Sequence, residues 1–177
     1  MTHQSYLEPH ACVAHTRADG SADIWSCSKT PFAVRGQLAN CTGIAKEKLV
    51  FHPMHIGGDF GGKGGFMDVA VAYFLSKKAG LPVKMVMDYT EELTAGNPRH
   101  ASIIKVKTGV KKNGLMIAEH IEFYFDSGAY GSYRPQGYLV GAHDAPGPYR
   151  VPNCLIEERY VYTNKMPAGY MRAPGHL

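Results

Sequence analysis

Apolar and polar positions alternate most regularly between residues 104 and 125. Every second position from 104 to 110 is isoleucine, valine or threonine, with lysine or glycine between them. After Asn113-Gly114, apolar residues return at positions 117, 121, 123 and 125, interrupted by Glu119. Period-two alternation is typical of a strand with one buried face, and Asn-Gly is typical of a two-residue hairpin turn. This pattern predicts an antiparallel hairpin.

Shorter apolar runs predict further strands over residues 6–15 (broken by Pro9), 22–27, 49–56, 83–87 and 155–163. Helices are expected over residues 31–40, where Thr30 precedes Pro31 as a cap, and over 66–79, where Gly80 ends the helix. Residues 88–100 predict a loop with one helical turn. The strand–helix–strand order from 49 to 87 favours a right-handed crossover on a partly parallel sheet. The expected fold class is α+β, or mixed α/β, with a mixed β-sheet, a crossover helix and an antiparallel hairpin.

Residues 57–65, called here the glycine loop, contain six glycines in nine positions. The loop falls between a predicted strand and a predicted helix N-terminus, where free amides and the helix dipole favour an anionic ligand. Glycine, which has no Cβ, accepts positive φ and lets a ligand approach the backbone closely. The simpler alternative is a surface turn.

Neither common nucleotide motif is intact in the glycine loop. Gly57 and the pair Gly62-Lys63 match most of a P-loop, but Gly64 stands where magnesium coordination needs serine or threonine. The dinucleotide pattern fails because Met67 stands where it requires glycine. A phosphate-binding protein that uses Lys63 in a variant P-loop remains an alternative hypothesis.

Composition narrows the classes of function. The 177 residues are 45% hydrophobic and 19% charged, which describes a globular chain rather than a disordered one. The net charge of +4 comes from scattered residues without a basic block, so no nucleic-acid partner is expected. The four cysteines lack Cys-x-x-Cys spacing, so neither a zinc ribbon nor an iron–sulfur cluster is expected within the chain. There is no signal-peptide pattern and no long apolar run, so the expected location is cytoplasmic, without a membrane partner.

Several stretches, taken in order, resemble one known family. They are Tyr6-Leu7-Glu8-Pro9-His10, Trp25-Ser26 with Pro31, residues 57–63, residues 148–153 and residues 171–175. Each is weak alone, whereas their order and spacing are fairly specific. Over nearly its whole length the chain resembles the molybdenum-binding subunit of the xanthine dehydrogenase/aldehyde oxidase family.

The resemblance implies that the glycine loop approaches a molybdopterin cofactor, with Phe60 and Gly61 approaching the metal's oxo ligand by backbone amide. Lys29 matches a family glutamine that hydrogen-bonds an oxo group, and it could instead be an exposed lysine in a degenerate site. Arg172 matches the family's arginine loop, and its simpler alternative is a surface salt bridge. The implied cofactor-binding residues are Gly58, Asp59, Phe60, Gly61, Gly62, Lys29, Arg172 and Ala173.

Three departures bear on the substrate. Purine-specific members carry glutamate where this chain has Gly64, an arginine where Val140 aligns, and an aromatic residue where Pro174 stands. A purine substrate is therefore not expected.

Family subunits are far longer, and their general-base glutamate is expected beyond residue 177. The resemblance therefore assigns no catalytic residue and no metal ligand here, and describes residues 1–177 as a partial molybdopterin-binding domain, from a fragment, a truncated chain or a split subunit. It implies 2Fe-2S and FAD on partner subunits or domains, with the remaining molybdenum-subunit half, an iron–sulfur subunit and a FAD subunit as partners. The intact enzyme would oxidise a small-molecule substrate, at a carbon of an aldehyde or N-heterocycle, with water as the oxygen source. The alternative is a non-catalytic binding or assembly piece.

Overall fold

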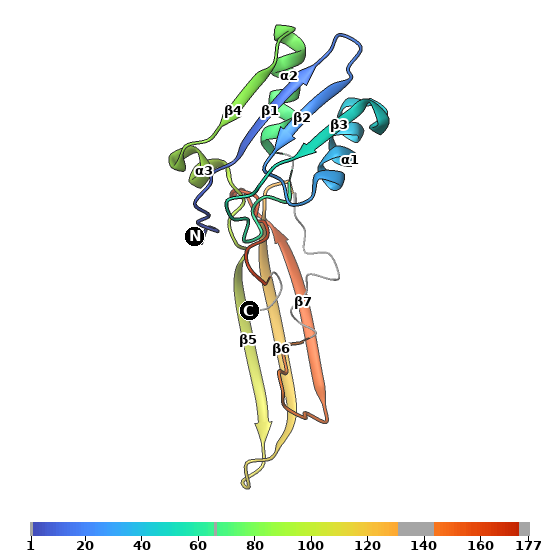
Figure 1. Ribbon diagram of the computed structural model, residues 1–177. Helices are drawn as coiled ribbons and strands as arrows, with labels where there is room; N and C mark the ends of the chain where they lie inside the picture. The colour runs from blue at the N-terminus through green and yellow to red at the C-terminus, as the bar shows by residue number, and fades with distance from the viewer. Residues whose placement is uncertain (1, 66, 131–143, 174–177) are drawn as a thin grey trace. The chain divides into compact units, whose positions relative to one another are not determined.

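The structure, a computed structural model, describes residues 2–65, 67–130 and 144–173 (Figure 1). The chain divides into two compact units. One consists of Ser5–Gly96, and the other of Met1–Gln4 with Asn97–Leu177. We call them the first and second unit. Within the described residues, no helix combines the length and the hydropathy needed to cross a bilayer.

The first unit is built on a four-stranded sheet with the order β3-β2-β1-β4. Its strands are β1 (Ala11–Thr16), β2 (Ala22–Ser26), β3 (Leu49–Pro53) and β4 (Val83–Val86). Strand β1 pairs antiparallel with both β2 and β4, whereas β2 and β3 are parallel. The β1–β2 turn is stabilised by Asp19, which accepts a hydrogen bond from the Ser21 amide at 3.0 Å.

Two helices, α1 (Pro31–Thr42) and α2 (Met67–Ala79), pack on one face of this sheet (Figure 1). Alternate residues of β1 and β2 are buried, as the period-two geometry of a strand requires when one face is covered. The resulting core joins both helices to the sheet and consists of Cys12, Ala14, Ala22, Ile24, Val34, Leu38, Ala39, Leu49, Val69, Ala72 and Tyr73. A short 3₁₀-helix, η1 (Lys46–Lys48), precedes β3.

The predicted crossover on a partly parallel sheet is confirmed: β3 and β4 run parallel to each other at opposite edges of the sheet, and α2 connects them past the β1–β2 hairpin. The adjacent parallel pair is β2 and β3, with α1 between them in the chain. One expectation about this unit needs correction. Residues 88–100 contain a seven-residue helix, α3 (Tyr89–Ala95), rather than a single turn. Its capping box, in which Asp88 and Glu91 each accept a hydrogen bond from the other's amide, was readable as Asp-x-x-Glu.

The second unit holds a three-stranded sheet with the order β5-β6-β7. Strands β5 (Ala101–Val110) and β6 (Met116–Gly128) form the predicted antiparallel hairpin, and β7 (Cys154–Tyr162) pairs parallel with β6. The two-residue turn is wrong, since Val110 pairs with Met116 and five residues connect the strands. Gly114, at φ +86°, takes the left-handed position of that connection. The small core of this unit contains Ile121, Phe123 and Phe125, with Ala145, Ile156 and Tyr160 packed against it.

Val140 and Pro174, two of the three positions that argue against a purine substrate, lie outside the described residues.

Candidate cofactor-binding loop

The glycine loop lies between β3 and α2, where the sequence predicted it. Its backbone is left-handed at three positions: Gly58 at φ +99°, Phe60 at φ +44° and Gly61 at φ +101°. A non-glycine residue costs about 1 kcal/mol in this region, so surrounding contacts must hold Phe60 there. Phe60 is 45% exposed, so it is only partly buried in the first unit.

Asp59 holds the turn from within the loop. One carboxylate oxygen, Oδ2, accepts the Gly61 amide at 2.8 Å, and Oδ1 accepts the Lys63 amide at 2.7 Å. The Asp59 carbonyl also accepts the Gly62 amide at 2.8 Å. The resemblance led us to expect that the Gly61 amide approaches an oxo ligand. In the structure it instead donates a hydrogen bond to the Asp59 side chain.

Lys29 lies beside the glycine loop, with its Nζ 2.9 Å from Asp59 Oδ2. Burial alone would raise the pKa of the Asp59 carboxyl, but hydrogen bonds from Lys29 and from the Gly61 and Lys63 amides hold it below its usual value. Asp59 is therefore an ionised carboxylate at neutral pH, and Lys29 is its cationic partner.

The segment around Lys29 also supports the second half of the loop. The Lys29 amide and the Ser28 hydroxyl donate to the Lys63 carbonyl at 3.1 and 3.3 Å. The Thr30 hydroxyl donates to the Gly64 carbonyl at 3.0 Å. Thr30 therefore makes no side-chain cap on α1, and the expected capping role is wrong because its hydroxyl serves the loop instead.

Lys63 is buried within the first unit, with 1% of the residue exposed. Its Nζ lies 2.5 Å from Glu8 Oε2 and 4.8 Å from the centre of the Tyr6 ring. Glu8 Oε2 also accepts the Gly57 amide at 2.9 Å. Burial alone would raise the pKa of the Glu8 carboxyl, but Lys63 and the Gly57 amide lower it overall. Since the Lys63 ammonium is committed to Glu8, it does not serve a variant P-loop.

A buried network near Glu8 was missed at the level of sequence. Glu92 of α3 is fully buried, and its carboxylate contacts His10 Nδ1 at 2.7 Å, the His10 amide at 2.8 Å and the Tyr6 hydroxyl. Burial and the Glu92 carboxylate both raise the pKa of Tyr6. From the sequence, Tyr6, Glu8 and His10 could be recognised only as parts of a family motif. Their interaction partners, Lys63 and Glu92, are distant in the sequence.

The N-terminus of α2 offers less to an anion than the sequence suggested. Its first turn carries Asp68, a buried carboxylate that already complements the helix dipole. Asp68 Oδ2 has no hydrogen-bond partner among the described residues. Any anion affinity of this region therefore rests on the loop backbone rather than on the helix end.

The predicted arginine-loop residues Arg172 and Ala173 belong to the second unit, with left-handed φ values of +25° and +44°. Three side chains of that unit hold the preceding backbone. Their bonds run from Asn97 Nδ2 to the Pro167 carbonyl (3.0 Å), from Gln4 Nε2 to that of Tyr170 (2.5 Å), and from Arg99 Nη1 to those of Met171 (3.1 Å) and Arg172 (3.2 Å).

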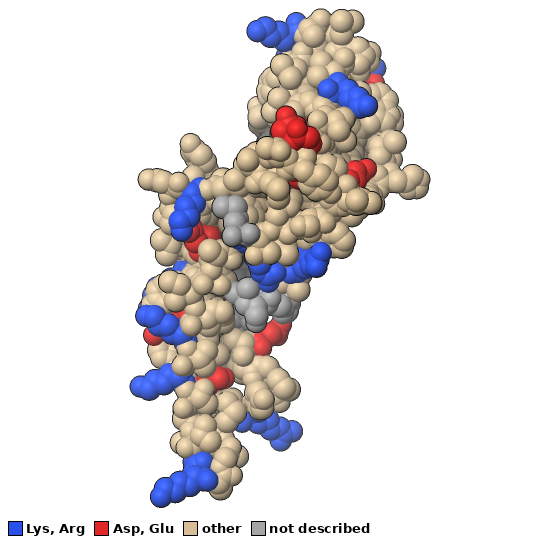
Figure 2. All heavy atoms as spheres, turned by 90° about the vertical axis from the view of Figure 1, so that its left-hand side faces the viewer, with Lys and Arg blue, Asp and Glu red and all other residues tan. Residues whose placement is uncertain are grey.

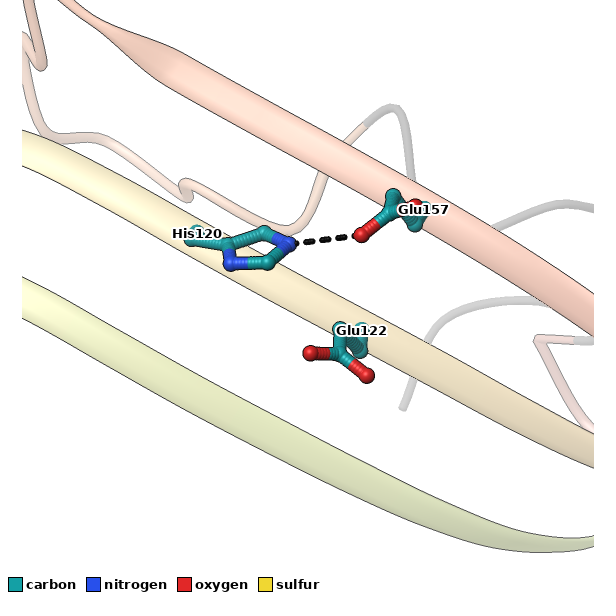
Figure 3. A group of neighbouring side chains, drawn as sticks. All are labelled: His120, Glu122 and Glu157. Carbon is teal, nitrogen blue, oxygen red and sulfur yellow. Dashed lines mark hydrogen bonds and ion pairs between the residues drawn. The ribbon is translucent and has the colours of Figure 1, made fainter.

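A cluster on the second sheet joins His120 and Glu122 of β6 to Glu157 of β7 (Figure 3). One ligand atom from each lies within 4.8 Å of the others, and His120 Nε2 is 2.8 Å from Glu157 Oε2. Arg159 already contacts both carboxylates, at 3.4 Å for Glu122 and 3.1 Å for Glu157. We interpret the cluster as cross-strand ion pairing.

On the face seen in Figure 2, Lys and Arg side chains stand apart from one another.

The glycine loop suits a closely apposed anionic cofactor. Its two charged side chains are both paired with a residue of opposite charge, Asp59 with Lys29 and Lys63 with Glu8. The loop would therefore present mainly backbone to a ligand. The first two glycines also pack closely against the N-terminal segment. A Cβ at Gly57 would lie 2.6 Å from Glu8 Cβ, and one at Gly58 would lie 3.0 Å from Tyr6 Cβ. The Gly57–Gly58 backbone is therefore fixed against the N-terminal segment.

Comparisons with known proteins agree with this description. A family model described as "Molybdopterin cofactor-binding domain" matches residues 1–177. The nicotinate dehydrogenase large molybdopterin subunit of Eubacterium barkeri is 32% identical over 99% of this chain and 41% of its own length. A probable xanthine dehydrogenase subunit from Bacillus subtilis is 33% identical over 97% of this chain and 23% of its own length. The chain thus spans about two fifths or less of these relatives.

Solved structures share the fold. Quinoline 2-oxidoreductase from Pseudomonas putida 86 superposes with a TM-score of 0.90 at 23% identity, covering 98% of this chain and 23% of that one. The Cu,Mo-CO dehydrogenase superposes with a TM-score of 0.85 at 26% identity, covering 96% of this chain and 22% of that one. The resemblance seen in the motifs is therefore confirmed, and in these relatives the matching α+β segment is part of a longer chain. The chain belongs to the molybdopterin cofactor-binding domain family of the molybdenum hydroxylases.

Proposed function

We propose that this chain supplies one wall of the molybdopterin site in a molybdenum hydroxylase. The enzyme would oxidise a carbon of an aldehyde or N-heterocycle, with water as the oxygen source. The observation that carries the proposal is the left-handed turn at Phe60 and Gly61, held by Asp59 in a chain that matches the family over its whole length. Strained backbone of this kind clusters at active sites and ligand-binding sites.

The loop residues proposed to contact the cofactor are Gly58, Asp59, Phe60, Gly61 and Gly62, with Lys29 beside them. The glycines would let the cofactor approach the main chain, and the half-exposed Phe60 ring would bound the space in which it lies. The molybdenum cofactor, when bound, would supply the redox centre at which such substrates are oxidised, namely the molybdenum that molybdopterin carries. The chain's own part is to orient that group, and none of these residues is proposed as a catalytic base.

Arg172 and Ala173 form a separate part of the proposal, drawn from the family resemblance. Their left-handed backbone, supported by Gln4, Asn97 and Arg99, would present a fixed surface to the cofactor. A loop held by side-chain hydrogen bonds loses little entropy on binding, which favours a role in positioning.

The rest of the active site would come from partners. We propose that the general-base glutamate belongs to the remaining molybdenum-subunit half, and that 2Fe-2S and FAD belong to further subunits of a cytoplasmic complex. One relative, 34% identical over 78% of this chain, is named as the gamma subunit of the 6-hydroxypseudooxynicotine dehydrogenase complex. That name supports a multi-subunit assembly for this chain as well.

The proposal is tested by producing the chain together with its genomic neighbours. The purified complex should contain molybdenum and pterin, and should oxidise an aldehyde or an N-heterocycle with incorporation of oxygen from labelled water. A complex that turns over without molybdenum would refute the proposal.

A non-catalytic assembly piece is the second candidate. One observation favours it. Lys29 stands where the family has a neutral amide donor, and its ammonium is paired with the Asp59 carboxylate. Such a chain, purified by itself, should lack pterin and turnover yet still capture a partner subunit. Turnover by the chain alone would exclude this alternative.

A further inference from the structure

The pairing of Lys29 with Asp59 is the feature of the loop wall that the family resemblance does not explain. Asp59 is the acidic residue of the glycine loop, and its side chain is 19% exposed. The Lys29 side chain is 41% exposed and reaches the carboxylate from the segment before α1. An ion pair this exposed typically contributes less than about 1 kcal/mol to folding. We therefore look for the role of the Lys29–Asp59 pair in ligand binding by the loop rather than in folding stability.

Molybdopterin carries a phosphate group, so an unpaired carboxylate in the wall of its site would repel it. Lys63 cannot compensate Asp59, because its buried ammonium is already paired with Glu8. Lys29 donates to the same oxygen, Oδ2, that accepts the Gly61 amide. It thus acts on the atom that holds the left-handed turn.

We propose that Lys29 is the counter-ion of Asp59 and a positioning residue of the loop, rather than a donor to the cofactor. The cofactor site therefore tolerates the Asp59 carboxylate only while Lys29 is paired with it. This inference rests on the proposed function and specifies how the loop comes to accept an anionic group.

The decisive variant is Lys29→Gln in the complex purified with its genomic neighbours. If Lys29 donated directly to the cofactor, glutamine would retain a neutral amide donor and the pterin content would be unchanged. If Lys29 is the counter-ion, glutamine leaves Asp59 unpaired, and pterin per mole of protein should fall about tenfold, a loss of about 1.4 kcal/mol in binding. Lys29→Arg should retain the pterin, because it keeps a cation beside the Asp59 carboxylate.

Hydrogen exchange of the peptide that covers residues 57–65 gives a readout independent of the cofactor. Lys29→Gln should speed exchange at the Gly61 and Lys63 amides, which both donate to Asp59, and Lys29→Arg should not. Lys48→Gln is the matched control, since Lys48 forms an exposed pair with Asp19 at 3.4 Å. It should change neither pterin content nor loop exchange.

Unchanged loop exchange in Lys29→Gln, or equal pterin loss in Lys29→Gln and Lys29→Arg, would overturn the counter-ion role. Absence of pterin from the wild-type complex would instead refute the proposed function, and the exchange experiment would still decide whether Lys29 and Asp59 act as a pair.

Discussion

Lys63 Nζ lies 2.5 Å from Glu8 Oε2, and the two residues are 55 positions apart in the sequence. The lysine is buried and the Glu8 side chain is 37% exposed, so this pair joins the inside of the glycine loop to the N-terminal segment. Glu8 reinforces the junction through two hydrogen bonds with the Gly57 main chain. The loop is therefore anchored at its start.

Lys63→Met should destabilise the first unit by about 2 kcal/mol, because it leaves the half-buried Glu8 carboxylate without its cation. Chemical denaturation measures the loss, with Lys77→Met on the exposed surface of α2 as the control. Neither wild type nor variant should bind ATP. Nucleotide binding that depends on Lys63, or a variant as stable as the control, would contradict this assignment.

Glu92 should make the protein sensitive to acid. Burial alone would raise the pKa of Glu92, but hydrogen bonds from His10 and Tyr6 lower it from 4.5 to about 2. A folded-state pKa below the unfolded value stabilises the protein above pH 4.5, and this stabilisation is lost as the pH falls towards 2. The difference corresponds to about 3 kcal/mol.

Glu92→Gln should therefore lower stability near neutral pH and flatten its decline in acid, as measured by urea midpoints at several pH values. Glu47→Gln, at an exposed position, serves as the control and should follow the wild-type profile. A Glu92→Gln profile parallel to that of the wild type would show that the carboxylate is not the acid-sensitive group.

Gly58→Ala should cost more than Gly43→Ala. Both glycines have positive φ, +99° and +72°, so both variants carry the cost of a left-handed alanine, about 1 kcal/mol. At Gly58 the added Cβ would also lie 3.0 Å from Tyr6 Cβ, whereas nothing lies within 4 Å at Gly43. Equal unfolding free energies for the two variants would mean that the loop does not press against Tyr6.

Arg99→Met should loosen the arginine loop, because methionine keeps much of the aliphatic stem but loses the donors to the Met171 and Arg172 carbonyls. The expected cost is about 1 kcal/mol, with faster hydrogen exchange in the peptide that contains residues 167–173. Lys105→Met, on β5, is the comparison variant. Exchange that responds equally to both changes would argue against a specific support by Arg99.

Strands and helices could be predicted because each depends on a local pattern. The hairpin of β5 and β6, the helix α2 and the position of the glycine loop all follow from period-two alternation, capping glycines and turn residues. The order of strands in the first sheet could not be read, because it depends on which strands pair across the chain. The crossover from β3 through α2 to β4 was predicted, but the insertion of β2 and β1 between those strands was not.

The candidate site shows the same division. Gly58, Phe60 and Lys29 could be named from a motif, and the structure places Lys29 beside the loop. The ion pair of Glu8 with the buried Lys63 and the contacts of the buried Glu92 could not be found, because the partners are 55 and 82 residues apart in the sequence. Thr30 was misread for the opposite reason, since a hydroxyl before a helix usually caps it.

The hydrogen bond from Thr30 to Gly64 also has a dynamic consequence. Thr30 directly precedes α1 and Gly64 lies near the end of the glycine loop, so fraying of the helix start withdraws a support from the loop. Ordering of the loop by a ligand would in turn slow the opening of α1. The two segments are therefore coupled in their fluctuations, and binding at the loop should stabilise a helix that need not touch the ligand.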